Sequence, residues 1–125
     1  GVPGFIQDAG LFALQQDHAF EDRISAPFRR RHAAALAYLT KRGVPVVPSM
    51  ASMYLMVDVR KSGLSGEAFA ERLLAEHHIA VMPGESFGQA AAGHLRVALT
   101  VEDSRLMDAI QTLANVIDRL SAEAA

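Results

Sequence analysis

The sequence predicts an α/β (α+β) two-layer sandwich, in which a small sheet of three to four strands packs against helices. Two observations support this fold class. Apolar residues recur at helical spacing in some segments and alternate in others, in the order helix, helix, strand, helix, strand, strand, helix. The chain has 125 residues, half of them hydrophobic. That size suits one domain with its own core, which we place at residues 1–125.

The first two predicted helices cover residues 5–19 and 26–42. The first is apolar nearly all round, with Phe5, Ala9 and Phe12 on one face, which indicates burial from several sides or a missing partner. Pro27 suits the first turn of the second helix. Gly43 can take the left-handed position that ends it.

The next two predicted elements are a strand at residues 52–59 and a helix at residues 66–77. Alternation along SMYLMVDV places Met53, Leu55, Val57 and Val59 on one face of the strand. The other face is also largely apolar near its middle, so we expect the strand to be covered on both sides. Ser65 is a suitable N-cap for the helix.

Two further strands are predicted at residues 79–82 and 94–99, with a Pro-Gly turn after the first. Leu95, Val97 and Leu99 alternate toward the core. Thr100-x-x-Asp103 resembles a capping box that opens the last helix. Its expected buried stripe recurs at spacings of four and three, at Leu106, Ile110, Leu113, Ile117 and Leu120.

Composition excludes several classes of function. The net charge is −2 with the signs interspersed, which argues against a nucleic-acid partner. The basic run Arg29–Arg31 is interpreted as a solvated helix face. Without cysteine there is no disulfide or thiolate site, and no apolar run approaches the ~20 residues that span a bilayer. No signal peptide is recognisable, so we expect a cytoplasmic protein without a membrane partner.

Arg96 is the most informative single residue, because a lone guanidinium inside a strand is costly unless it meets an anion. It lies on the strand face opposite Leu95 and Val97. A salt bridge to Asp58 on a neighbouring strand is one interpretation, and a carboxylate or phosphate ligand is the other. No metal-ligand pattern and no acid/base pair of carboxylates emerges, and Gly84-x-x-x-Gly88 is interpreted as a turn rather than a phosphate loop.

Three segments in this order resemble a known family: ASMYLMVDV, GLSGEAFAERLLAEHHIAVMPGESFG and GHLRVALT. They are similar to the C-terminal small domain of class I/II aminotransferases, the PLP-dependent enzymes of fold type I. The start, PGFIQDAGLFALQ, resembles the segment that joins their two domains, so about residues 1–20 are expected to form an interdomain helix. Among subgroups, the sequence of these segments looks most like that of arginine–pyruvate transaminases.

The resemblance implies two substrate-binding residues: Arg96 binds the substrate α-carboxylate, and Tyr54 lies near that carboxylate. It implies that this chain is part of a longer enzyme, the parent, which is a homodimer. The parent would use pyridoxal 5′-phosphate (PLP) to move an amino group between an amino acid and a 2-oxo acid. The Schiff-base lysine of the family lies in a Ser-x-x-Lys motif of the large domain. Lys41 and Lys61 lie in no such motif. We therefore expect no catalytic or cofactor-binding residue here, no PLP bound to this chain and no activity from it alone, with the large domain as its partner.

Two other functions remain open at this point. A stand-alone binding or regulatory domain would use Arg96 for an acidic small molecule, and its surface would expose little apolar area. A structural oligomerisation module would use Arg96 in a salt bridge. A severed small domain would instead leave apolar area exposed along its first helix.

Overall fold

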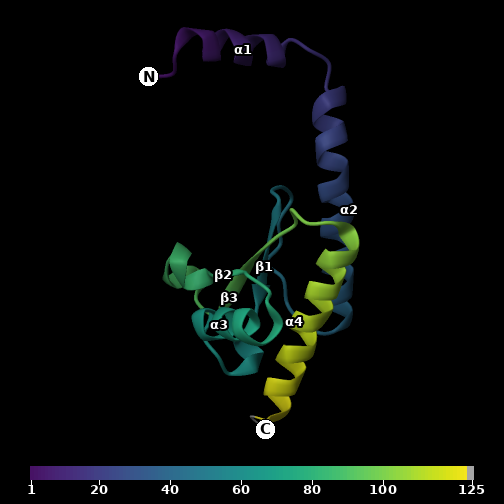
Figure 1. Cartoon of the computed structure of the whole chain (residues 1–125), viewed down its shortest axis with the longest axis vertical. Helices are drawn as coiled ribbons and strands as arrows, with labels where there is room; N and C mark the ends of the chain where they lie inside the picture. The colour runs from purple at the N-terminus through teal and green to yellow at the C-terminus, as the bar shows by residue number, and fades with distance from the viewer. Residues whose placement is uncertain (124–125) are drawn as a thin grey trace.

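The computed structural model describes residues 1–123 and contains four α-helices and three strands within that range. Figure 1 shows a long helical pair on one side of a small sheet and a shorter helix below it. The helices are α1 (Gly4–Leu14), α2 (Ala19–Lys41), α3 (Gly66–His77) and α4 (Asp103–Glu123), and the strands are β1 (Tyr54–Asp58), β2 (Met82–Pro83) and β3 (His94–Ala98), with short 3-10 turns at Arg60–Ser62, Gly84–Phe87 and Gln89–Ala91.

The three strands form an antiparallel sheet in the order β1-β3-β2. Met56 on β1 and Met82 on β2 both lie opposite Arg96, which places Arg96 on the central strand. The predicted α+β architecture with a three-stranded sheet is therefore confirmed. The strand expected at residues 79–82 is shorter and begins only at Met82.

One face of the sheet packs on the helices and forms the core. Leu55, Val57 and Leu95 have no exposed surface, and the stripe predicted on α4 is buried along its whole length. The prediction that the 52–59 strand is covered on both sides is wrong. Its other face, with Tyr54 and Met56, is only half-buried, because helices cover just one side of the sheet. That half-open face carries Arg96.

Helix α2 begins eight residues before the predicted Pro27. The carboxylate of Asp17 accepts a hydrogen bond from the Ala19 N–H, and Glu21 and Asp22 lie in the first turn, where acidic residues favour a helix start. Pro27 consequently lies inside the helix. The acidic residues before Pro27 are thus a stronger start signal in this helix than the proline itself.

Helix α1 has no buried residue. Phe5, Phe12 and Leu14 are 72%, 66% and 83% exposed. In Figure 1 this helix lies apart from the sheet and from α4, joined to them only through the first turns of α2. Of the two expectations for the first helix, a missing partner fits and burial from several sides does not. An apolar helix in this state indicates a surface that another element covers.

The basic run Arg29–Arg31 is solvent-exposed at Arg29 and Arg30, as predicted, but not at Arg31. Arg30 Nε and Arg31 Nε lie 2.9 and 2.7 Å from the two carboxylate oxygens of Asp103, the first residue of α4. Arg31 is largely buried and also donates a hydrogen bond of 3.1 Å to the Leu99 carbonyl. The predicted capping box is also wrong, because α4 starts at Asp103 and that carboxylate binds α2 instead of a backbone N–H.

We expect the α2–α4 connection to weaken in acid. Hydrogen bonds from Arg30 and Arg31 hold the pKa of Asp103 below its ordinary value of 3.8. Its contribution to stability is therefore complete above pH 3.8 and lost as the pH falls through the lower pKa of the folded state. Urea titrations between pH 7 and pH 2 should show a smaller acid-induced loss for Asp103→Asn than for wild type. Equal losses would mean that other carboxylates govern acid unfolding.

Candidate functional site

The candidate site is the half-open face of the sheet around Arg96. In an antiparallel pair, residues directly opposite one another share a face, and so do residues two apart on one strand. Arg96 therefore shares its face with Met56, Met82 and, two residues from Met56, Tyr54. The sheet brings together the two residues that the family resemblance paired, Arg96 and Tyr54.

Two aromatic rings border the guanidinium. Its central carbon lies 4.3 Å from the centroid of the Tyr54 ring and 4.6 Å from that of Phe87. At these distances the positive charge interacts with the π-faces. The contacts cover flat surface of the guanidinium, whereas the N–H groups at its edge are the ones that bind a carboxylate.

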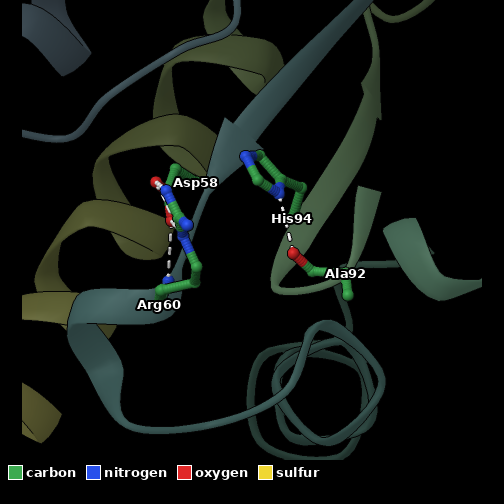
Figure 2. A network of polar contacts seen from close by, with 4 residues as sticks. All are labelled: Asp58, Arg60, Ala92 and His94. Atoms are coloured by element: carbon green, nitrogen blue, oxygen red, sulfur yellow. Dashed lines mark hydrogen bonds and ion pairs between the residues drawn. The ribbon is translucent and has the colours of Figure 1, made fainter. Parts of the chain in front are cut away.

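Arg96 makes no ion pair and no side-chain hydrogen bond with any residue between 1 and 123. The alternative in which Asp58 neutralises it is wrong, because the Asp58 carboxylate binds the Arg60 guanidinium through several hydrogen bonds, as Figure 2 shows. That hydrogen bonding lowers the pKa of Asp58 below its ordinary 3.8. Arg96 therefore has no acidic partner among the described residues.

His94 lies two residues before Arg96 on the same face, and one nitrogen of its ring contacts the backbone. Its Nδ1 lies 2.9 Å from the carbonyl oxygen of Ala92, and a proton on Nδ1 makes this a hydrogen bond (Figure 2). Asp58 is its cross-strand partner. This histidine belongs to the edge of the site and contributes to the turn that leads into β3.

Phe87 is the site residue that sequence reasoning did not single out. It ends the 3-10 turn Gly84–Phe87 between β2 and β3, and its side chain is 49% exposed. The signal was present as an aromatic-Gly pair after Pro83-Gly84. A turn pattern does not reveal which strand residue its side chain will contact, so the stacking on Arg96 could be seen only in the structure.

The same turn carries Glu85, whose side chain faces the backbone. Its Oε1 accepts hydrogen bonds from the N–H groups of Gly66 and Gly93, at 2.9 and 3.0 Å. The Gly93 N–H, followed by the N–H groups of Glu85 itself and Gly66, lowers the pKa of this carboxyl below its ordinary 4.5. Glu85 is therefore ionised at neutral pH and bound to amides, not to Arg96.

The structure has two cavities of note in the described residues, and neither is lined by Arg96 or Tyr54. One of about 370 Å³ is bordered by α2 and by Ser52, two positions before Tyr54. The other, of about 630 Å³, lies between α3 and α4 and reaches Val97 and Ala98. Arg96 itself is half-buried.

The described residues include no cluster of three or more histidines, cysteines or carboxylates that could hold a metal ion. Lys41 is the last residue of α2 and Lys61 lies in the turn Arg60–Ser62, both exposed. The face of Arg96 presents aromatic and thioether groups and no amine.

The family model described as aminotransferase class I and II matches residues 2–113. The chain belongs to the class I and II aminotransferases. The transaminase sequences similar to it include an arginine–pyruvate transaminase of Pseudomonas aeruginosa, 37% identical over 115 residues, and an LL-diaminopimelate aminotransferase of Oleidesulfovibrio alaskensis, 33% identical over 111 residues. The match covers 91% of this chain and 29% of the first relative, and 89% and 28% for the second.

Solved aminotransferase structures share the fold. The aromatic aminotransferase of Pyrococcus horikoshii superimposes with a TM-score of 0.79 at 27% identity, over 92% of this chain and 31% of that one. A Thermus thermophilus aspartate aminotransferase mutant gives 0.71 at 32% identity, over 79% and 25%. The chain thus spans less than a third of the aminotransferases that it matches. No helix in residues 1–123 has the length and apolar character to cross a bilayer.

Proposed function

We propose that this chain is the C-terminal small domain of a PLP-dependent transaminase. It supplies Arg96, with Tyr54 and Phe87 against it, to bind the substrate carboxylate, and we call these three residues the carboxylate clamp. The parent exchanges an amino group between an amino acid and a 2-oxo acid. The observation that supports this most strongly is Arg96, half-buried against Tyr54 and Phe87, with no acid bound to it among residues 1–123. A guanidinium with a free N–H edge matches a carboxylate in shape and charge.

The arginine positions the substrate for the reaction. Two parallel N–H···O bonds fix the carboxylate in one plane and restrict the orientation of the neighbouring α-carbon. Tyr54 and Phe87 lie against the guanidinium and exclude water from part of it, which strengthens the attraction to an anion. PLP supplies the electron-withdrawing ring for amino transfer when bound, and it belongs to the large domain of the parent.

The exposed apolar surface of α1 fits the same proposal. Phe5, Phe12 and Leu14 would be covered by the large domain, with α1 as the interdomain helix. The small domain would then close over the bound substrate as a lid, carrying Arg96 with it. A finished stand-alone binding domain would not leave this helix uncovered, and a salt-bridged structural module would pair Arg96 with an acid.

The experiment is a comparison of amino transfer by two proteins, this chain alone and the longer polypeptide that contains it with a lysine-bearing large domain. A panel of amino acids, arginine included, is offered with pyruvate in the presence of PLP. We expect the longer polypeptide, a cytoplasmic homodimer, to form the new amino acid. The chain alone should form none and should carry no lysine-linked PLP by mass spectrometry after borohydride reduction. A longer polypeptide that is inactive on the whole panel would contradict the proposal.

A further inference from the structure

The carboxylate of Glu85 joins three separate pieces of the fold. It lies in the turn Gly84–Phe87, and its two amide partners are Gly66, the first residue of α3, and Gly93, the residue before β3. Its second oxygen is buried and has no hydrogen-bond partner among the described residues. The turn is therefore tied by one side chain to the start of a helix and to the start of the strand that carries Arg96.

The surroundings of this carboxylate leave room for little else. A Cβ at Gly66 would overlap Glu85 Oε2 and the His94 carbonyl oxygen, and a Cβ at Gly84 would overlap the Ala91 carbonyl oxygen. Gly93 has φ +73°, a conformation that glycine adopts most easily. Glycines at these positions permit the close backbone approach that brings two N–H groups to one oxygen atom.

Phe87 lies in the same turn, two residues after Glu85. It is half-exposed, and its ring lies 4.6 Å from the central carbon of the Arg96 guanidinium. Amide binding also keeps the Glu85 carboxylate occupied, just as Arg60 occupies Asp58. Both carboxylates on the elements that flank Arg96 are therefore engaged elsewhere, and its charge is left free.

We propose that Glu85 is a positioning residue of the carboxylate clamp: it holds the 84–87 turn so that Phe87 stays against Arg96 and the guanidinium edge stays open. This inference rests on the proposed function, because it needs Arg96 to bind substrate. Glu85 itself touches no substrate, since its carboxylate is bound to the backbone amides of Gly66 and Gly93. It acts through Phe87.

The test reads the Phe87–Arg96 contact directly by NMR, in this chain and without turnover. The aromatic rings shift the Arg96 side-chain protons upfield, and Phe87→Leu measures the part that Phe87 causes. Glu85→Asp keeps the charge but is one methylene too short for both amides. Glu85→Gln keeps the length of the side chain and one oxygen acceptor. We expect Glu85→Asp to lose the Phe87-dependent shift and Glu85→Gln to keep most of it.

The same variants in the longer polypeptide give a second readout. Misplacing a binding group by a fraction of an ångström to 1 Å costs up to about a hundredfold, so Glu85→Asp should raise KM for amino acids roughly tenfold or more, with a smaller change in kcat. Glu85→Gln should stay within about threefold of wild type. A wild-type Arg96 shift in both Glu85→Asp and Glu85→Ala would overturn the role of Glu85, while a loss of activity in Arg96→Ala would still support the clamp.

Discussion

Replacing Arg96 with alanine in the longer polypeptide is expected to lower kcat/KM for amino acid substrates by roughly a hundredfold to ten-thousandfold. A hydrogen bond to a charged group contributes about 1.5–3 kcal/mol, and the guanidinium edge can make two of them to one carboxylate. Because 1.36 kcal/mol corresponds to a factor of ten, the loss is two to four powers of ten on this estimate. Steady-state kinetics with several amino acids measure it.

The fold should tolerate this substitution. Arg96 has two ring contacts and no ion pair within residues 1–123, and each ring contact contributes about 0.5–1 kcal/mol at an exposed position. The free energy of unfolding of the chain, measured in urea, should therefore change by no more than about 1–2 kcal/mol. Arg105→Ala is the matched control, since this exposed arginine on α4 makes no ion pair with residues 1–123. Its kcat/KM should stay at the wild-type level. A large loss of stability in Arg96→Ala would favour the structural-module interpretation.

Replacing Phe69 with alanine is expected to cost the largest amount of folding free energy, about 3–5 kcal/mol. Phe69 lies on α3, has no exposed surface and is among the largest fully buried side chains. Its removal leaves a cavity between α3 and the sheet that the surrounding side chains fill only in part. Urea or thermal unfolding of the chain measures the loss.

The control for this substitution lies on the same helix. Leu74 is 54% exposed, so Leu74→Ala should cost well under the value for Phe69→Ala and close to the ±0.5 kcal/mol typical of surface positions. Similar losses at the two positions would mean that α3 packs differently from the arrangement described above. The Phe69→Ala variant that remains folded should still bind carboxylates, because Phe69 lies on the core side of the sheet.

Patterns local in sequence were enough to predict the buried stripe of α4, the N-cap of α3 and the two faces of β3. The stripe from Leu106 to Leu120 lies buried at 3.6-residue spacing, and the Ser65 hydroxyl accepts a hydrogen bond from the Ala68 N–H as an N-cap should. Alternation along residues 94–99 correctly placed Leu95 in the core and Arg96 on the opposite face. These features depend on residues a few positions apart, which a sequence displays directly.

Contacts between distant segments could not be predicted in the same way. Asp103 looked like part of a capping box, yet it binds Arg31, 72 positions earlier. Phe87 and Glu85 looked like turn residues, and nothing in their spacing shows that one contacts Arg96 and the other Gly66. Family resemblance pointed to Arg96 and Tyr54, whose side chains lie in contact, but it did not indicate Phe87 or the hydrogen bonds of Glu85 to backbone amides.

The most direct test of the clamp varies the substrate and the arginine together. An amino acid and its primary amide differ only at the carboxylate, so wild-type and Arg96→Ala forms of the longer polypeptide are compared on both by kcat/KM. If Arg96 binds the substrate carboxylate, Arg96→Ala lowers kcat/KM at least a hundredfold for the acid and changes it less than about threefold for the amide. An equal loss for acid and amide would contradict this role, because Arg96 would then act on something other than the substrate carboxylate.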